Sequence, residues 1–246
     1  MLFRVGEISF YSYGLMVGLG FALGVLVASR RAEKKGVDPD SLFWFFMLLL
    51  AAGVAGGRLF SIVQDRWFYS DWKSVLDLRE GGLAMHGVLL GGVIGMAAYA
   101  RTKEIPFGRL SDIVTPSIAL GQSLGRIGCF FNGCCYGVET GGSWGFMTRY
   151  APGLRHPYQL YESLLDFVLF LVLLKLDTKL KVEGELFLVY LFGYSFLRFF
   201  LEFVRENDRY FLGLSYGQWA SAGLAFLAAI LLLYFGKKNR SNLNTE

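Results

Sequence analysis

The chain has 246 residues, of which 54% are hydrophobic, 17% are aromatic and only 18% are charged. Soluble domains average about 25% charged residues, so this composition argues against an ordinary water-soluble enzyme. The formal net charge of +4 does not indicate nucleic-acid binding, because lysine and arginine in a membrane protein mostly report topology.

Seven apolar segments follow one another along the chain. Each is about long enough to cross, as a helix, a hydrocarbon core about 30 Å thick. The sequence therefore predicts an all-α membrane protein with seven transmembrane helices, which form a single integral membrane domain over residues 1–246. The predicted spans cover roughly residues 10–28, 42–63, 83–100, 112–131, 159–176, 185–204 and 213–236.

Lysine and arginine are unevenly distributed between the segments that connect these spans. Thirteen lie in one alternating set of connections, counting Lys175 at the end of the fifth span, and eight lie in the other. Because cytoplasmic segments carry the excess, the pattern predicts an N-terminus outside and a cytoplasmic C-terminus. It also predicts two outer loops, at about 64–82 and 132–158, and a short polar C-terminal tail at 239–246. The positive charges follow the first apolar run, the reverse of a secretory signal, so we expect that run to be retained as a helix.

Two of the predicted spans are interrupted by glycines, in "HGVLLGGVIG" and "GQSLGRIG". Small residues let helix backbones approach closely, so we expect both spans to lie inside the helix bundle.

Three arginines, Arg58, Arg126 and Arg198, fall within predicted spans. An ionisable group there costs about 2.5–3.5 kcal/mol on insertion scales, so it usually has a partner or a task. Arg126 and Arg198 should lie toward the outer ends of their helices, where two planar guanidinium groups would suit a phosphate. The alternative is snorkelling toward lipid headgroups. Arg58 has two equal interpretations: a structural ion pair with a carboxylate inside the bundle, or a role in a site.

The stretch "LRFFLEFVRE" spaces Arg198, Glu202 and Arg205 at i, i+4 and i+7, on one face of a helix. Glu202 would then pair with either arginine and hold it in place. For Arg205, at a helix end, snorkelling or pairing with a loop is an equal alternative to a site role.

The chain has two histidines. His86 opens the third predicted span on its outer side, at the depth predicted for the arginines, and its ordinary pKa near 6.5 suits proton transfer. A hydrogen-bonded packing role is the alternative. His156 precedes a proline at a predicted helix start and is expected to cap or orient that segment.

The three cysteines, Cys129, Cys134 and Cys135, occur together in "GRIGCFFNGCCYG". Their spacing is not that of a zinc knuckle, and both histidines are remote in sequence, so no metal site is predicted. A disulfide from Cys129 to Cys134 or Cys135 is feasible on the oxidising side of a membrane. A nucleophilic cysteine activated by Arg126 is a further alternative.

Five motifs in this order, "YSYGLM", "GGLAMHG", "GRIGCFFNGCCYG", "HPYQLYES" and "LRFFLEFVRE", resemble those of bacterial prolipoprotein diacylglyceryl transferases. The resemblance implies an enzyme of the bacterial cytoplasmic (inner) membrane, multi-pass, with its active site toward the outer leaflet. Its partners would be membrane lipids, phosphatidylglycerol and the lipobox peptide of a prolipoprotein. The diacylglyceryl group would pass to the lipobox cysteine as a thioether, with release of glycerol 1-phosphate. No metal or cofactor is implied.

The same resemblance assigns roles to particular residues. It implies that Arg126 and Arg198 grip the lipid phosphate and that His86 is functional. His86, a neighbouring tyrosine or the leaving phosphate would accept the thiol proton. The candidate substrate-binding residues are Tyr13, Asn132, Glu202, Tyr161 and Arg205.

The central motif departs from one common family form, "GRIGNFxNGE", because Cys129 stands in place of an asparagine and Cys134 in place of a glutamate. Two other functions therefore stay open. One is a family paralogue acting as a membrane thiol oxidoreductase through Cys129, Cys134 and Cys135, and the other is an anion transporter.

Overall fold

The computed structural model describes residues 3–5, 8–10, 12–66, 69, 71–76, 81–208 and 210–243, and in most of them the chain is helical. Two short antiparallel hairpins, β1 with β2 and β3 with β4, accompany the helices. The elements in chain order are β1 (Phe3–Val5), β2 (Ile8–Phe10), α1 (Ser12–Lys34), α2 (Pro39–Gln64), α3 (Trp72–Leu76), α4 (Met85–Thr102), α5 (Phe107–Asn132), β3 (Phe146–Thr148), β4 (Ala151–Arg155), α6 (Tyr158–Leu176), α7 (Glu185–Leu201), the 3₁₀ turn η2 (Phe211–Gly213) and α8 (Tyr216–Leu243).

Each of the seven predicted spans overlaps one long helix: α1, α2, α4, α5, α6, α7 or α8. Three stretches among the described residues are long and apolar enough to cross a membrane: Ser12–Lys34, Pro39–Gln64 and Tyr216–Gly236. Helix α1 runs past the predicted end at residue 28, because the polar "RRAEK" that follows consists of good helix formers. Helix α7 ends at Leu201, earlier than predicted, and the described part of the predicted polar tail continues α8 as helix.

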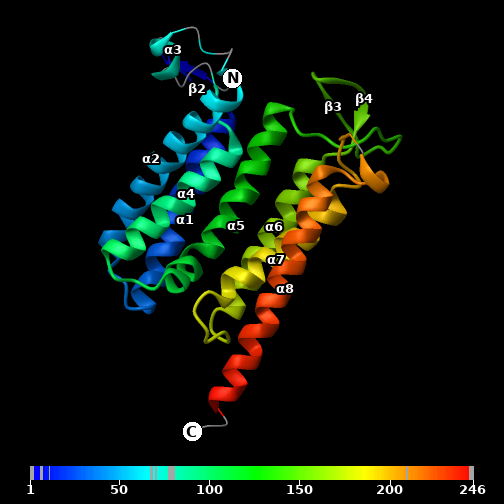
Figure 1. The fold of residues 1–246 in the computed structure, drawn as a ribbon. Helices are drawn as coiled ribbons and strands as arrows, with labels where there is room; N and C mark the ends of the chain where they lie inside the picture. The colour runs from blue at the N-terminus through cyan, green and yellow to red at the C-terminus, as the bar shows by residue number, and fades with distance from the viewer. Residues whose placement is uncertain are drawn as a thin grey trace. The chain divides into compact units, whose positions relative to one another are not determined.

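The chain divides into two compact units, which are described separately. In the unit of residues 29–110, helices α2 and α4 lie side by side along their length (Figure 1). Glycines make this contact possible: a Cβ atom on Gly87 would overlap the carbonyl oxygen of Gly56, and one on Gly91 that of Ala52. The close approach predicted from "HGVLLGGVIG" is therefore confirmed.

Arg58 of α2 is buried and binds the segment that leads into α4. Its guanidinium donates to the carbonyl oxygens of Val75, at 2.7 Å, and Gly82, at 3.1 Å, and also to those of Ser74 and Gly81. These four main-chain acceptors hold the guanidinium group in place, and the ion pair with a carboxylate stays a prediction. Arg58 thus fixes part of the predicted loop 64–82, which contains the short helix α3.

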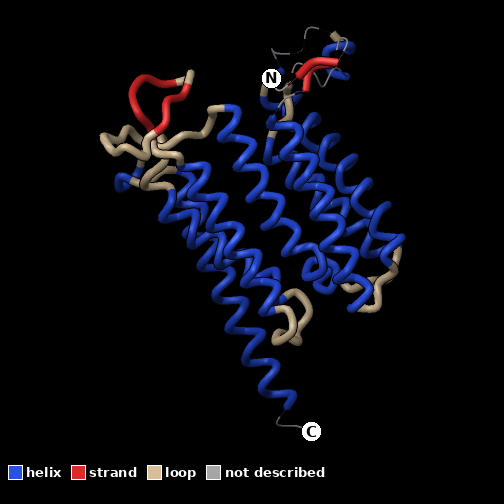
Figure 2. Tube along the Cα trace, turned by 180° about the vertical axis from the view of Figure 1, so that it is seen from behind, coloured by secondary structure: helices blue, strands red, loops and turns tan. Residues whose placement is uncertain are grey.

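The second unit comprises residues 1–28 and 111–246. Helices α6, α7 and α8 run alongside one another, and α8 continues beyond the connection between α6 and α7 (Figure 2). The buried core contains residues of three helices: Ala119 and Leu120 of α5, Leu169, Phe170 and Leu173 of α6, and Leu186 and Tyr190 of α7. The aliphatic and aromatic side chains of this core pack the three helices against one another.

A buried carboxylate fixes the start of α7. Asp112 of α5 accepts hydrogen bonds from the backbone N–H groups of Gly184, at 2.8 Å, and Phe187, at 3.0 Å. These donors have no acceptor within the first turn of a helix, and the carboxylate also complements the helix dipole. Helices α5 and α7, which both carry candidate site residues, are therefore joined by polar contacts as well as by the core.

The predicted loop 132–158 contains the β3–β4 hairpin, which lies where α5 ends and α6 begins (Figure 1). Main-chain hydrogen bonds tie this loop to the segment after α7: Val138 N–H donates to Val204 C=O at 2.8 Å, and Glu206 N–H donates to Tyr136 C=O at 3.3 Å. The end of α5, the start of α6 and the end of α7 are thereby brought to one place.

Candidate anion-binding site

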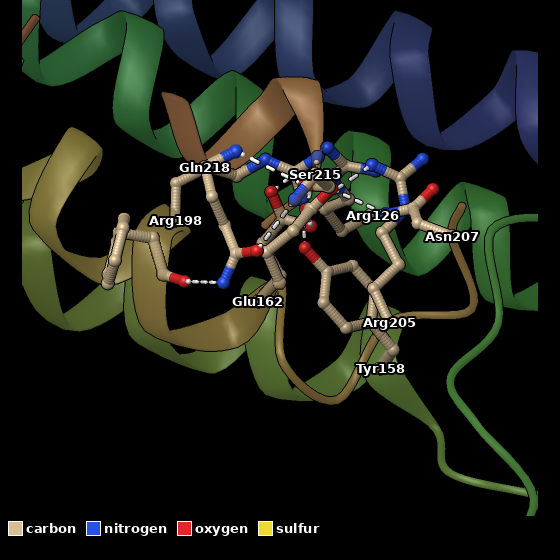
Figure 3. A network of polar contacts seen from close by, with 10 residues as sticks. Arg126, Tyr158, Glu162, Arg198, Arg205, Asn207, Ser215 and Gln218 are labelled. Atoms are coloured by element: carbon tan, nitrogen blue, oxygen red, sulfur yellow. Dashed lines mark hydrogen bonds and ion pairs between the residues drawn. The ribbon is translucent and has the colours of Figure 1, made fainter. Parts of the chain in front are cut away.

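Arg126 and Arg198 converge on one carboxylate (Figure 3). The Nη2 atom of Arg126, on α5, lies 2.9 Å from Oε1 of Glu162, on α6. The Nη1 atom of Arg198, on α7, lies 3.7 Å from Oε2 of the same glutamate. The two guanidinium groups, 72 residues apart in sequence, therefore share one acidic partner.

A second glutamate extends the series of ion pairs. Glu202 Oε2 lies 2.9 Å from Nη2 of Arg198 and 3.7 Å from Nη1 of Arg205. The predicted pairing of Glu202 with the arginines is confirmed, but the reason given for Arg205 was wrong. Helix α7 ends at Leu201, and Arg205 lies in a β-bridge with Gly137, so the turn after the helix brings Arg205 to Glu202.

Neutral polar groups form hydrogen bonds to the charged side chains. The hydroxyl of Tyr158, whose side chain is fully buried, accepts a hydrogen bond from Nη1 of Arg198. Glu202 Oε1 accepts from the side-chain amide of Asn207 and from Ser215 Oγ, the latter at 3.1 Å. Gln218 donates to the carbonyl oxygen of Phe199 at 3.3 Å and so ties α8 to the end of α7.

The order along this chain of ion pairs is Arg126, Glu162, Arg198, Glu202, Arg205, which we call the arginine–glutamate chain. The side chains of its two glutamates are only 1% and 3% exposed, whereas those of the three arginines are 22%, 13% and 23% exposed, in chain order. With all five side chains ionised, the arginine–glutamate chain carries one net positive charge. Its exposed side is cationic and its buried side acidic, an arrangement that suits an incoming anion.

The chemistry of this donor set favours a phosphate. Each guanidinium is planar and presents several N–H groups, so arginines from different helices can bind different oxygens of one phosphate. The buried glutamates position the arginines before the ligand arrives. Positioned donors of this kind stabilise negative charge that develops during a reaction.

Three other predicted site residues lie in the same unit, each with its own contacts. The ring and Cα of Tyr13 face Gly128, two residues after Arg126; a Cβ on that glycine would lie 3.2 Å from the Tyr13 ring. The carbonyl oxygens of Asn132 accept from Arg149 at 3.4 Å. The hydroxyl of Tyr161 lies 3.2 Å from Nδ1 of His156. Tyr13 therefore contacts the helix that carries Arg126, and Tyr161 directly precedes Glu162 on α6.

His86 belongs to the other unit, at the start of α4. Its exposed ring lies 5.9 Å from that of Phe60, between ring centroids. Within that unit it lines an open hollow with Ser61, Gln64 and Asp65. Its role in proton transfer stays a prediction.

The three cysteines come together after all. Their Sγ atoms all lie within 4.8 Å of one another, and all three thiols are free. A hydrogen bond from Cys129 lowers the pKa of the Cys135 thiol to about 5, and Arg205 and Arg126 act in the same direction. Burial instead raises the pKa of Cys134. Among these two thiols, the thiolate form is therefore favoured at Cys135 and disfavoured at Cys134.

Sequence reasoning missed Glu162 and Tyr158, although both lie in the motif "HPYQLYES". The cost of placing charge in a span was considered for arginines only. The same argument applies to Glu162 and to Asp166, which lies one turn further along α6 and is 2% exposed. It would have identified the acidic partner of the arginines.

Comparison with known proteins gives one consistent result. The family model described as "Prolipoprotein diacylglyceryl transferase" matches residues 1–234. A phosphatidylglycerol–prolipoprotein diacylglyceryl transferase of Clostridioides difficile is 33% identical over 95% of this chain and 94% of its own length. A transferase of the same name, numbered 2, from Clostridium perfringens is 35% identical over 94% and 93% of the two chains. One from Bacillus cereus is 32% identical over 97% and 93%.

Proposed function

The chain belongs to the prolipoprotein diacylglyceryl transferase family, and on that premise we propose that it moves a diacylglyceryl group from phosphatidylglycerol to a prolipoprotein. The acceptor is the thiol of the lipobox cysteine. A carbon–sulfur bond forms at the glycerol carbon, the bond from that carbon to the phosphate oxygen breaks, and glycerol 1-phosphate leaves. The relatives compared are all named as transferases, and nothing among them supports a thiol oxidoreductase or an anion transporter.

One observation carries this assignment: Arg126 and Arg198 approach one buried carboxylate from different helices while their own side chains stay partly exposed. Negative charge on the phosphate grows as the carbon–oxygen bond breaks. Two guanidinium groups already aimed at that position stabilise the transition state more than the ground state, which is what accelerates the reaction.

The remaining members of the arginine–glutamate chain position these two side chains. Glu162 sets the separation of Arg126 and Arg198, and Glu202 orients Arg198 from its other side. Tyr158 holds the Nη1 edge of Arg198. Arg205 supplies a third guanidinium at the edge of the same set, where it would contact the lipid headgroup.

The nucleophile comes from the substrate, so the enzyme has to receive its proton. His86 is the proposed acceptor, since an imidazole has the right basicity near neutral pH. Tyr13, Asn132 and Tyr161 are proposed to line the path of the lipid and the lipobox peptide. Tyr13 faces Gly128, two residues after Arg126, and Tyr161 directly precedes Glu162 on α6, and both facts support this proposal.

We further propose that α1, α2, α4, α5, α6, α7 and α8 all span the bacterial cytoplasmic membrane. The thirteen-to-eight distribution of lysine and arginine supports an outside N-terminus and a cytoplasmic C-terminus. The arginine–glutamate chain then faces the outer leaflet, where exported prolipoproteins arrive, and no nucleic acid is involved. A reporter active only outside the cytoplasm should be inactive when fused to the C-terminus, and activity there would contradict this orientation.

The function is tested with the purified protein in detergent, phosphatidylglycerol and a synthetic lipobox peptide. The peptide should gain the mass of one diacylglyceryl group on its cysteine. Arg126→Ala and Arg198→Ala should abolish the gain, whereas Arg101→Ala, at an exposed position near the end of α4, should keep it. Absence of the mass gain with the parental protein would refute the proposed reaction. Full activity of either site variant would refute the phosphate assignment.

A further inference from the structure

The cysteine cluster is a feature that the transfer reaction does not use. Cys129 lies in the last turn of α5, and Cys134 and Cys135 follow the end of the helix. Gly133, at φ +78°, and Cys135, at φ +59°, adopt the left-handed conformation. The chain reverses there and brings the two later thiols back beside the first.

The distances between the sulfur atoms match those around a bound metal ion. Zinc–sulfur bonds are about 2.3 Å long, so two thiolates on one tetrahedral ion lie about 3.8 Å apart. The Sγ atoms of Cys134 and Cys135 are 3.6 Å apart, and all three Sγ atoms lie within 4.8 Å of one another. Closing a remaining gap of at most about 1 Å would bring all three within bonding distance of one ion.

The surroundings hold the cluster in place and balance its charge. The side-chain amide of Gln159, which is fully buried on α6, donates to the carbonyl oxygen of Cys134 at 2.5 Å. The guanidinium groups of Arg126 and Arg205 act electrostatically on the Cys135 thiol. A divalent ion bound by three thiolates carries one net negative charge, which these arginines compensate. All three cysteines are partly buried, so an ion has access but is shielded from bulk water.

We propose that Cys129, Cys134 and Cys135 form a site for one thiophilic divalent cation of the zinc class. The three thiols release their protons and bind the ion as thiolates, which leaves one position of a tetrahedron for water or another ligand. The site has no counterpart in the motif form "GRIGNFxNGE", which has asparagine and glutamate at the positions of Cys129 and Cys134. It does not depend on the transfer reaction, because the ion is held by residues outside the arginine–glutamate chain.

Cobalt(II) is the probe of choice, because thiolate ligands give it an intense charge-transfer absorption. The full-length protein, purified in detergent, reduced and freed of metal with a chelator, is titrated with Co²⁺. We expect the absorption to saturate at one equivalent and to disappear when Zn²⁺ is added. The variant with all three cysteines replaced by serine should show no such band. His156→Ala, which removes a nearby metal-binding side chain that the proposal does not use, should bind as the parental protein does.

A second measurement does not depend on the folding of a variant. One equivalent of Zn²⁺ should protect all three thiols of the parental protein from a thiol-specific reagent, and a chelator should restore their reactivity. The proposal is overturned if the band is absent in the reduced parental protein or persists in the cysteine-free variant. It is also overturned if zinc protects none of the thiols, or if two of them remain disulfide-bonded under reducing conditions.

Discussion

The carboxylate of Glu162 lies 2.9 Å from the guanidinium of Arg126 and is 1% exposed, yet it also faces Arg198 from a third helix. One buried acid thus sets the spacing of two cations. A buried charge is costly unless it is paired, and here the buried carboxylate lies between two cations. This pairing positions both arginines before any substrate binds.

Replacing Glu162 with glutamine should lower the transfer rate by about 100-fold, because loss of the carboxylate lets both guanidinium groups move by about 1 Å or more. The rate is measured with lipobox peptide and phosphatidylglycerol vesicles. Glu206→Gln is the matched control, since that glutamate is 50% exposed and pairs only with Arg155 among the ion pairs described. Equal rates for the two variants would show that Glu162 does not position the arginines.

Replacing Arg198 with lysine keeps the charge but removes the planar fork. A single ammonium cannot reach Glu162, Glu202 and Tyr158 together, so we expect kcat to fall by about 10²–10³-fold, the usual loss for one transition-state donor. Arg101→Lys, at an exposed position, should leave kcat unchanged. If Arg198→Lys alters only KM, the arginine contributes to ground-state binding and not to the chemical step.

The contact between α2 and α4 predicts opposite effects at two adjacent glycines. Gly91→Ala would drive a methyl group into the carbonyl oxygen of Ala52, whereas a Cβ on Gly92 meets nothing within 4 Å. We expect Gly91→Ala to destabilise the protein by about 1–3 kcal/mol. Gly92→Ala should be neutral or slightly stabilising, since alanine favours helix. Thermal midpoints in detergent compare the two, and equal midpoints would contradict this packing.

The thiols predict an unusual pH dependence of alkylation. The hydrogen bond from Cys129 stabilises the thiolate of Cys135 and lowers its pKa to about 5. Only the thiolate reacts, so the alkylation rate at Cys135 should rise through a midpoint near pH 5 and be nearly constant at neutral pH. Mass spectrometry of peptides treated with iodoacetamide gives the rate at each residue. Cys129→Ala should raise the midpoint, and an ordinary midpoint in the parental protein would refute the assigned hydrogen bond.

The amino-acid sequence predicts the helices well because apolar length is a local property. It also identifies Arg126, Arg198 and Glu202, since a charge within an apolar run is conspicuous by its cost. Glu162 obeys the same rule, yet it is missing from the predicted site residues. The prediction that Arg205 lies on the same helix as Arg198 was wrong for a different reason. Apolar residues continue past Leu201, and nothing in the local sequence indicates that the helix ends there.

Other features depend on contacts that no local pattern reveals. Arg58 donates to the main-chain carbonyl groups of residues 74, 75, 81 and 82, which come within its reach only in the folded protein. The cysteines meet because Gly133 and Cys135 reverse the chain, and left-handed backbone at a cysteine is not predictable from its identity. The β3–β4 hairpin is too short to show strand periodicity.

The central claim is that Arg126 and Arg198 together hold the departing phosphate. The most direct measurement is an experimental structure of the full-length protein with phosphatidylglycerol bound. The account predicts phosphate oxygens within about 3 Å of both guanidinium groups, the usual length of such charge-assisted hydrogen bonds. A phosphate bound elsewhere, with both arginines still engaged only by Glu162 and Glu202, would contradict it.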